Sequence, residues 1–409
     1  MSVRRVARAP LAATLGLAAV ALAGCAQTPP ASGPVTTPAP SVPSASASAS
    51  APPTAAASPS VAHPPTCPEL AAGMTPRERA GQLVMMGVTG GLDAAEARTL
   101  SDGAFGSVIL MGSTTDGVAG TRARTDAIQE AGGGAVLVAV DQEGGLVQRL
   151  KGPGFDTMPS ASEQADLGPA ELTTAAARWG KQMVDAGVHL DLAPVADVVP
   201  ADKLRSNEPI GKLGRGYGTT PDEVAQNVAA VVAGFREAGL SASPKHFPNL
   251  GQVVGNTDFT AKVVDDVTTA DAAALAPYRR LIADGVETVM VGTAWYTHID
   301  ADAPAAFSPA VIGVLREDLG FTGVVVSDDL GVAKAVADVP AAQRAVRFVR
   351  AGGDLAISVD APAALAMVQG LAEATQGDEE LAAQATAAAG RVLALKAAHG
   401  LASCEPVLG

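Results

Sequence analysis

The sequence contains little cysteine, little histidine and little positive charge. Its 409 residues include three cysteines and five histidines, and 28 lysines and arginines against 42 aspartates and glutamates give a formal net charge of −14. Such an acidic chain is a poor partner for nucleic acid or for an anionic membrane surface. The histidines show no paired ligand spacing and no cysteine cluster accompanies them, so the sequence predicts no metal site and no cofactor.

Residues 26–66 contain no lysine, arginine, aspartate or glutamate and consist mainly of alanine, serine, proline and threonine. A segment of this composition cannot bury enough apolar surface to offset the entropy of ordering. We therefore expect a disordered tether over residues 25–66, followed by one folded domain over residues 67–409.

The N-terminal segment is typical of an export signal. Three arginines within the first eight residues precede an apolar run over 11–23 that is too short to span a bilayer as a lasting helix. The run ends in Leu-Ala-Gly-Cys25, which resembles the lipobox of bacterial lipoproteins. The resemblance implies a signal peptide over 1–24, lipidation of Cys25, and an exported protein on the extracytoplasmic face of the cell membrane. An ordinary secretory signal with an incidental cysteine is the alternative.

The other two cysteines stand at the two edges of the predicted domain. If Cys25 carries a lipid, Cys67 and Cys404 remain, and in an oxidising compartment a disulfide between them would join the two ends of the domain. Two unrelated thiols near frayed chain ends are the alternative.

Short apolar runs alternate with alanine-rich helical patterns from residue 67 onward. Unbroken β-branched runs indicate strands that are buried on both faces. The predicted strands are 82–86, 107–111, 135–140, 188–192, 240–243, 288–291, 323–326 and 355–359. About eight strands separated by helices favour an α/β fold of the (β/α)8 TIM-barrel type. An open doubly wound sheet would be expected to carry a glycine-rich phosphate loop after its first strand, and Met85-Met86-Gly87 is not such a loop.

Polar residues are concentrated where the predicted strands end. The third strand is followed by Asp141 and Arg149, the fourth by Asp197, the fifth by Lys245 and His246, and the seventh by Asp328 and Asp329. The carboxyl ends of barrel strands meet at the face where the active sites of such enzymes lie. We therefore expect these side chains to converge on one site.

Two of these positions allow more than one chemistry. Adjacent residues of a strand point in opposite directions, so only one of Asp328 and Asp329 is expected to face the barrel axis, and the other is a candidate helix N-cap. A carboxylate near Lys245 would stay ionised and suits a nucleophile or a stabiliser of an oxocarbenium ion. Lys245 itself could form a Schiff base in a lyase, but the acidic residues expected around it favour a charged, substrate-binding lysine.

Together these motifs resemble glycoside hydrolase family 3, and within it the single-domain β-N-acetylhexosaminidases of the NagZ type. The matching segments are Asp141-Gln-Glu-Gly-Gly-Leu-Val-Gln-Arg149, Leu192-Ala-Pro-Val195 with Asp197, Arg215-Gly-Tyr-Gly218, Lys245-His246-Phe-Pro and Gly320-Phe-Thr-Gly-Val-Val-Val-Ser-Asp328-Asp-Leu330. The resemblance implies a monomeric barrel enzyme that removes terminal β-linked N-acetylglucosamine from cell-wall or related glycans with retention of configuration. It also implies that Asp328 is the nucleophile and that the sugar is bound by Asp141, Arg149, Arg215, Lys245 and His246.

The chain departs from the family pattern where the proton donor is expected. In that pattern Lys-His-Phe-Pro-Gly-His-Gly leads to Asp-Ser-His, whose histidine is the acid/base, whereas this chain has Asn249-Leu250 and then Asn256-Thr257-Asp258. Asp258 could serve as the acid/base with a raised pKa, another residue could substitute, or the protein could bind glycans without efficient turnover. The intact nucleophile and sugar-binding motifs favour an active enzyme.

Three further residues have two interpretations each. Trp295 could stack on a sugar or pack against the protein, and His298 is a candidate substrate contact in the same loop. His189 stands inside an apolar run, which is more typical of a satisfied core residue than of a metal ligand.

Overall fold

The predicted apolar runs form one eight-stranded parallel sheet. The computed structural model describes residues 64–406, in which the strands follow the order β7-β6-β3-β2-β1-β13-β12-β9. The strands of this sheet are β1 (Val84–Thr89), β2 (Ser107–Met111), β3 (Leu137–Val140), β6 (Leu190–Asp191), β7 (Ser241–Ala242), β9 (Thr288–Val291), β12 (Val324–Asp329) and β13 (Leu355–Ser358). Because β13 pairs back with β1, the sheet curls into a (β/α)8 TIM-type barrel, as predicted.

The remaining gap, between β7 and β9, is closed by the chain that follows β7. Phe247 forms a parallel bridge with Val291, and its N–H donates to the carbonyl of Met290 at 2.7 Å. The N–H of Met290 in turn donates to the carbonyl of Pro244 at 2.9 Å. Lys245 and His246 lie within this closing segment, so barrel closure fixes their backbone positions.

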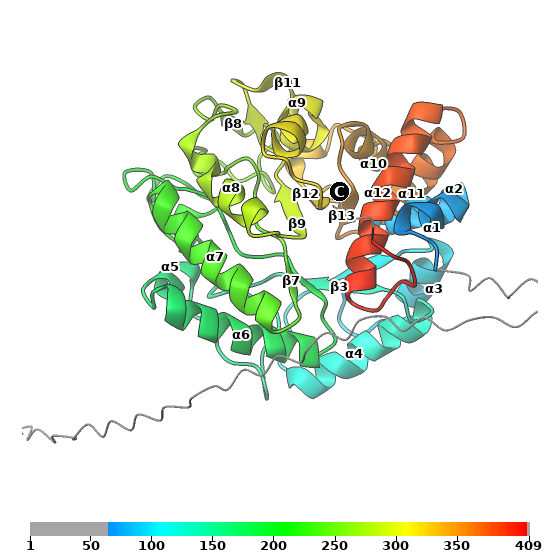
Figure 1. Ribbon diagram of the computed structural model, residues 1–409, viewed down its shortest axis with the longest axis horizontal. Helices are drawn as coiled ribbons and strands as arrows, with labels where there is room; N and C mark the ends of the chain where they lie inside the picture. The colour runs from blue at the N-terminus through cyan, green and yellow to red at the C-terminus, as the bar shows by residue number, and fades with distance from the viewer. Residues whose placement is uncertain (1–63, 407–409) are drawn as a thin grey trace, which may run out of the picture. The chain divides into compact units, whose positions relative to one another are not determined.

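Helices encircle the barrel, as Figure 1 shows. They are α1 (Cys67–Gly73), α2 (Pro76–Gln82), α3 (Ala94–Asp102), α4 (Gly117–Ala131), α5 (Ala161–Ala165), α6 (Pro169–Asp185), α7 (Pro221–Glu237), α8 (Ala276–Ala283), α9 (Pro309–Gly313), α10 (Ala341–Arg350), α11 (Ala361–Ala374) and α12 (Glu379–Ala398). None of the helices between residues 64 and 406 is both long enough and apolar enough to span a membrane.

The loops contain several shorter elements. The 3-10 and π turns are η1 (Gly211–Leu213), η2 (Ala273–Leu275), η3 (Ala305–Phe307), η4 (Val314–Asp318) and η5 (Lys334–Val336). A hairpin joins β4 (Gln142–Gly144) to β5 (Val147–Gln148), and a three-stranded sheet contains β8 (Val264–Asp265), β10 (Trp295–Tyr296) and β11 (Asp300–Pro304).

The barrel strands are buried on both faces, which explains why their sequences do not alternate. All four residues of β3, of β9 and of β13 are buried. One face of each strand fills the barrel interior and the other packs against the helices, so both faces require apolar side chains.

The first strand begins two residues later than the sequence predicts. Thr75 and Glu78 form a capping box that starts α2, and this helix continues through Gln82. The predicted signal peptide, Cys25 and most of the predicted tether lie outside the described residues.

The two ends of the described chain are joined. Cys67 and Cys404 form a disulfide with their Cα atoms 4.9 Å apart, and Cys67 N–H donates to the carbonyl of Glu405 at 3.0 Å. The structure therefore ties the start of α1 to the segment that follows α12.

Candidate active site

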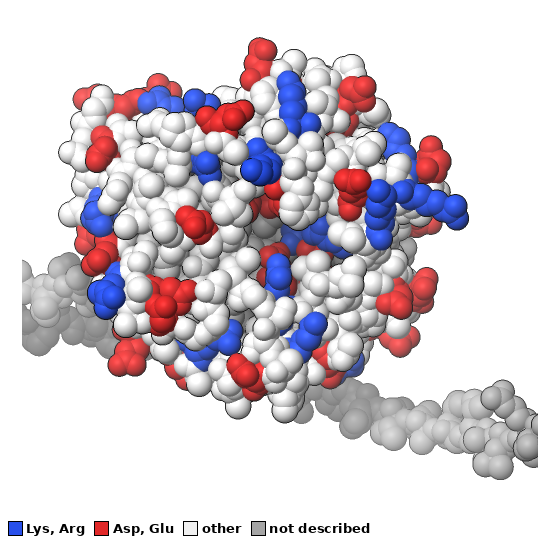
Figure 2. Space-filling model, turned by 180° about the vertical axis from the view of Figure 1, so that it is seen from behind, with Lys and Arg blue, Asp and Glu red and all other residues white. Residues whose placement is uncertain are grey.

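A cavity of about 600 Å³ opens at the carboxyl ends of the barrel strands. The cavity brings together the residues predicted to act as nucleophile, as acid/base and in sugar binding, which come from the end of β12 and from the chain after β3, β6 and β7. Its lining includes Asp141, Arg149, Arg215, Lys245, His246, Asp258 and Asp328. On the face seen in Figure 2, acidic and basic side chains surround a central hollow with both signs of charge at its base.

The hairpin after β3 positions the first group of side chains. Gly144 and Gly145 turn the chain with φ angles of 95° and 54°, and a Cβ on Gly144 would lie 2.2 Å from the carbonyl oxygen of Pro159. The Gln142 side chain spans the hairpin and accepts the backbone N–H of Arg149 at 2.9 Å. The two glycines and Gln142 therefore fix where Asp141 and Arg149 enter the cavity.

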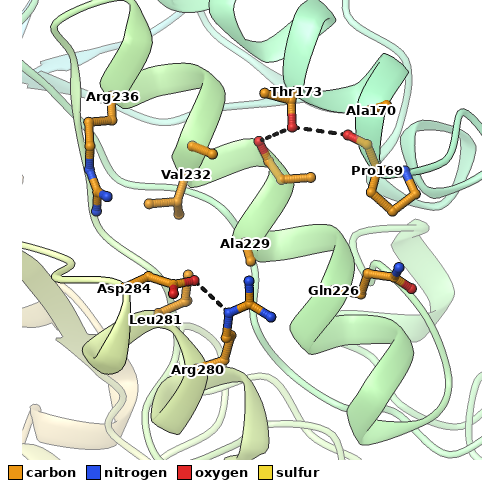
Figure 3. Close-up of a pocket in the computed structure, with 12 residues that line it drawn as sticks. Pro169, Ala170, Thr173, Gln226, Ala229, Val232, Arg236, Arg280, Leu281 and Asp284 are labelled. Carbon is orange, nitrogen blue, oxygen red and sulfur yellow. Dashed lines mark hydrogen bonds and ion pairs between the residues drawn. The ribbon is translucent and has the colours of Figure 1, made fainter. Parts of the chain in front are cut away.

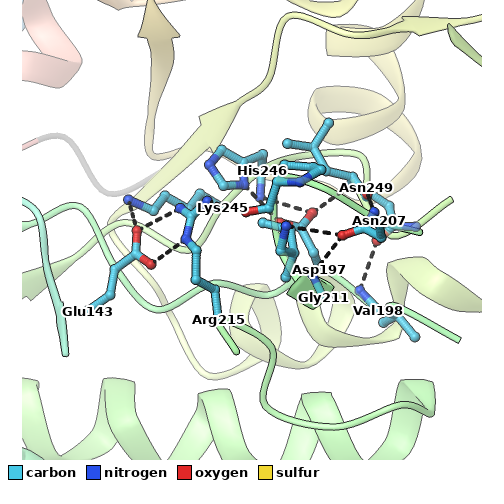
Figure 4. A network of polar contacts seen from close by, with 12 residues as sticks. Glu143, Asp197, Val198, Asn207, Gly211, Arg215, Lys245, His246 and Asn249 are labelled. Atoms are coloured by element: carbon cyan, nitrogen blue, oxygen red, sulfur yellow. Dashed lines mark hydrogen bonds and ion pairs between the residues drawn. The ribbon is translucent and has the colours of Figure 1, made fainter. Parts of the chain in front are cut away.

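A buried ion network forms the base of the cavity, as Figure 4 shows. The guanidinium of Arg215 donates to both oxygens of Glu143, each at 2.8 Å. The ammonium of Lys245 lies 2.6 Å from Asp141 and 2.7 Å from Glu143. Each cation in the network therefore has at least one carboxylate partner.

These pairings keep the buried groups charged. Burial works to lower the pKa of Lys245, but the charges of Asp141 and Glu143 raise it above its ordinary value. Burial works to raise the pKa of Glu143, but Arg215 and Lys245 lower it well below its ordinary value. Lys245 is consequently a protonated hydrogen-bond donor and not a free amine.

Glu143 is a site residue that the sequence reasoning missed. It follows Asp141 by two positions, and alternate residues of an extended chain face the same side. The spacing of two residues could have identified Glu143, because it directs both carboxylates toward Lys245.

His246 is held by a buried carboxylate. Its Nδ1 donates to Oδ2 of Asp197 at 2.8 Å, and Oδ1 of Asp197 accepts the backbone N–H of Leu250 at 2.6 Å. Asp197 has no solvent exposure. The imidazole orientation and the start of the following loop therefore depend on the same aspartate.

The loop that departs from the family pattern has a rigid first half. Oδ1 of Asn249 accepts the backbone N–H of Val198 at 2.8 Å, and the amide of Asn207 donates to the carbonyls of Leu250 and Val253 at 2.7 and 2.9 Å. A Cβ on Gly251 would lie 1.7 Å from the carbonyl oxygen of Val198. Asn249 belongs to the Asn-Leu pair that stands in place of the family's Gly-His, and its side chain anchors the first half of the loop to the backbone of Val198.

Asp258 lies in the second half of this loop, which is bound to the loop after β12. The backbone N–H groups of Lys334 and Ala335 donate to the carbonyls of Asp258 and Thr257, each at 3.2 Å. Asp258 is solvent-exposed as a residue and contributes to the lining of the cavity. Desolvation there and the negative charge of Asp328 raise its pKa to about 6, against the opposing influence of His246 and Arg215.

The aspartate pair at the end of β12 differs from the prediction. Both Asp328 and Asp329 line the cavity, although only one was expected to face it. Asp329 does not cap a helix; its carboxylate accepts the N–H groups of Gly331, Val332 and Val359 at 2.9, 2.8 and 3.0 Å. The irregular register at the end of β12 breaks strict strand alternation, which allows both residues to contribute to the lining.

Two of the remaining candidates lie outside the cavity. Trp295 is in β10, where the ammonium of Lys262 covers its ring at 4.0 Å, and Nε2 of His298 donates to the carbonyl of Asp266 at 2.7 Å. His189 is only partly buried and so is not a core residue, but its hydrogen bond is satisfied, because its Nδ1 accepts the N–H of Val138 at 3.0 Å. Within residues 64–406, no group of three or more His, Cys, Asp or Glu side chains could hold a metal ion.

A second groove, of about 520 Å³, lies on the outside of the barrel between α6, α7 and α8 (Figure 3). Arg280 and Asp284 pair with each other at 2.6 Å, and the hydroxyl of Thr173 donates to the carbonyls of Pro169 and Ala230. These polar groups are paired, and four alanines, together with Pro169, Val232 and Leu281, supply the apolar part of the lining. The cavity at the strand ends is therefore the candidate active site.

The fold and the cavity define a barrel protein with several carboxylates at its strand ends, and comparisons with known proteins identify its family. Residues 75–395 match the model of the glycosyl hydrolase family 3 N-terminal domain. The chain belongs to glycosyl hydrolase family 3 and is a glycoside hydrolase.

Individual relatives agree with this assignment. The chain is 33% identical to the β-hexosaminidase LpqI of Mycobacterium tuberculosis over 77% of this chain and 82% of the relative. It is 35% identical to a β-hexosaminidase of Alkalilimnicola ehrlichii over 70% of this chain and 82% of the relative. The crystal structure of a β-N-acetylhexosaminidase from Beutenbergia cavernae is similar with a TM-score of 0.77 and 41% identity, covering 80% of this chain and 99% of that one.

Proposed function

We propose that this protein is a retaining glycosidase that removes terminal β-linked N-acetylglucosamine from cell-wall or related glycans. The observation that carries the proposal is that Asp328 and Asp258 line one cavity above the ion network of Glu143, Lys245 and Arg215. The relatives named β-hexosaminidase and the similar crystal structure of a β-N-acetylhexosaminidase support the same substrate class.

In this mechanism Asp328 is the nucleophile. Its carboxylate attacks the anomeric carbon while the glycosidic oxygen takes a proton from Asp258, so that the leaving group departs as an alcohol. Asp258, now ionised, then removes a proton from water, which attacks the glycosyl-enzyme and releases the sugar with retained configuration. The raised pKa of Asp258, about 6, allows it to act as acid first and base second.

The sugar-binding residues would act through hydrogen bonds at the base of the cavity. Lys245 is fixed by Asp141 and Glu143, Arg215 is fixed by Glu143, and Asp141, Lys245 and Arg215 present acceptors and donors to sugar hydroxyls. The buried Nε of Arg149 has no hydrogen-bond partner among the residues described. An unpaired buried donor is costly, so we assign Arg149 to a substrate oxygen.

His246 is the second candidate for the proton donor. It lines the same cavity, and its contact with the buried Asp197 forms a histidine–carboxylate pair of the kind that acid/base catalysis often uses. We place Asp258 first because it belongs to the loop where the family pattern carries its acid/base.

A Schiff-base lyase is disfavoured by the contacts of Lys245. An amine nucleophile must be neutral, whereas both carboxylates near Lys245 stabilise its charged form. Borohydride trapping during turnover is expected to leave Lys245 unmodified.

Turnover of an activated aryl β-N-acetylglucosaminide tests the assigned roles. Such a leaving group needs little protonation, so Asp328→Asn should lower turnover at least about 10³-fold, whereas Asp258→Ala should retain the first step and accumulate glycosyl-enzyme. A 2-fluoroglycosyl substrate should label Asp328 in a peptide map. Absence of any turnover in the wild-type protein would instead favour a non-catalytic glycan-binding protein.

We further propose that the protein is exported as a monomer and anchored to the membrane by a lipid on Cys25, with residues 25–66 as the tether. A disulfide between Cys67 and Cys404 is compatible with an oxidising compartment. The Cys25→Ser variant should move from the membrane fraction to the soluble fraction. Retention of that variant in the membrane would contradict the anchor.

A further inference from the structure

The cavity has two layers of different character. Its base carries the charged network of Glu143, Lys245 and Arg215, whereas its mouth carries apolar side chains that remain open to solvent. Among the residues that line the cavity, Phe259 is 81% exposed, Val332 is 59% exposed and Leu213 is 37% exposed. Leu146, beside the lining residue Val147, is 77% exposed.

These apolar residues come from four separate loops. Leu146 is in the β4–β5 hairpin, Leu213 is in η1, Phe259 follows Asp258, and Val332 follows the Asp328–Asp329 pair. Single exposed apolar residues are common and need no explanation. Three loops each place one such residue in the lining of the cavity, and Leu146 adjoins a lining residue in a fourth loop, so the opening is suited to an apolar ligand group.

The position of Phe259 is fixed by the backbone. Its N–H donates to the carbonyl of Asn256 at 3.2 Å, and the N–H of Thr260 donates to the same carbonyl at 2.9 Å. The neighbouring carbonyl of Asp258 is held by Lys334 at 3.2 Å. The ring is thus presented by a hydrogen-bonded turn at the cavity mouth, next to the residue to which we assign protonation of the glycosidic oxygen.

The position of Phe259 next to Asp258 determines which part of the substrate its ring would contact. The sugar that is cleaved occupies the polar base, and the group attached through the protonated oxygen must extend toward the mouth. We propose that the apolar mouth is a leaving-group subsite that selects a leaving group with an apolar face, either an aromatic ring or the C–H face of a sugar, with Phe259 as its main platform. This inference rests on the proposed glycosidase function.

Two aryl β-N-acetylglucosaminides test the subsite. Their phenols have matched acidity, but one leaving group is a single ring and the other is an extended fused ring, so the chemistry is equal and the apolar area differs. We expect wild-type kcat/KM to favour the larger leaving group, and Phe259→Ala to reduce that preference about three- to tenfold, mainly through KM. Phe259 is exposed, so thermal unfolding of the variant should match that of the wild type.

Val254→Ala is the matched control. Val254 belongs to the same loop and is 61% exposed, but it does not line the cavity. This variant should keep the wild-type preference. An unchanged preference in Phe259→Ala, or an equal loss in Val254→Ala, would overturn the subsite.

A binding measurement separates this inference from the proposed function. The non-hydrolysable S-glycosides of the same two phenols are titrated by calorimetry into the wild-type protein, Phe259→Ala and Val254→Ala. If the wild type hydrolyses neither aryl glycoside, the proposed function fails, whereas a Phe259-dependent affinity difference still supports the subsite. If hydrolysis occurs and neither kcat/KM nor affinity depends on Phe259, only the subsite is wrong.

Discussion

Lys245 determines the charge balance at the base of the cavity. It has 3% side-chain exposure and lies within 2.7 Å of two carboxylates, while one of these, Glu143, also binds Arg215 through both oxygens. The removal of water makes each of these attractions stronger, and it also makes any uncompensated charge expensive. The network is therefore sensitive to the loss of a single partner.

The Glu143→Gln substitution should destabilise the protein. A neutral amide at this position would leave Lys245 and Arg215 with one fewer buried negative charge, so we expect the free energy of unfolding to fall by about 3 kcal/mol. Denaturant unfolding measures this change. The control is Glu208→Gln, which removes an exposed pair with Lys212 on the surface and should have an effect of about 0.5 kcal/mol or less. Equal effects of the two substitutions would contradict a structural role for the buried network.

The pKa of Asp258 predicts a pH dependence. The carboxyl must be protonated to act as an acid, and its pKa is about 6, so kcat/KM for a substrate with a poor leaving group should be high below pH 6 and fall above it. Asp258→Asn should lower the rate about 10²-fold or more and remove this decline. A decline that persists in Asp258→Asn and disappears in His246→Gln would assign the proton donor to His246.

The sequence predicted which residues meet in the cavity but not how they pair. The positions of Asp141, Lys245 and Asp328 follow from strand ends, because parallel strands present these ends on one face. The contact of Glu143 with Arg215 joins residues 72 positions apart through two irregular loops. Such loop conformations depend on long-range side-chain contacts with the backbone, which no local pattern encodes.

Among the elements, the β4–β5 hairpin is the one whose shape most directly places site residues. Gly144 has a positive φ and would have no room for a side chain against Pro159. A change in this turn would move Glu143 on one side and Arg149 on the other.

Gly144→Ala should therefore impair both stability and catalysis. We expect a loss of about 2–3 kcal/mol in the free energy of unfolding and a lower kcat/KM, measured by denaturant unfolding and by aryl glycoside hydrolysis. Gly285→Ala is the control, because Gly285 also has a positive φ of 77° but has no atom within 4 Å of the added Cβ. The control should cost about 1 kcal/mol and leave kcat/KM unchanged. A similar result at both positions would show that backbone strain alone, without the crowding, accounts for the effect.

The existence of the strands could be predicted, whereas their limits and the closure of the barrel could not. Runs such as 107–111 and 288–291 coincide with β2 and β9, because their apolar residues must be buried on both faces. Strands β6 and β7 have only two residues each, because the chain turns out of the sheet there and forms the loops of the site. The contact between Phe247 and Val291 that closes the barrel is made outside any pair of regular strands.

At the scale of the whole molecule, the disulfide between Cys67 and Cys404 encloses almost the entire barrel. The two cysteines are 337 residues apart, so the crosslink restricts a very long loop in the unfolded chain. The double variant Cys67→Ser/Cys404→Ser should lose about 6 kcal/mol of unfolding free energy by the chain-entropy model. Each single variant should lose a similar amount. Two reactive thiols at these positions in denatured, unreduced wild-type protein would contradict the crosslink.

The same crosslink brings the first and last described residues together, and a bridge between Thr66 and Glu405 continues this contact. The βα units of the barrel thus form a closed circle, in which the last unit lies beside the first and no unit must be the first in the sequence. A circular permutant that connects 406 to 64 through a short linker, with new ends in an exposed loop such as that before α12, should preserve the strand order and the cavity. The position of the chain ends could then be moved to another exposed loop, because the loops that form the catalytic face come from βα units before and after the natural chain ends.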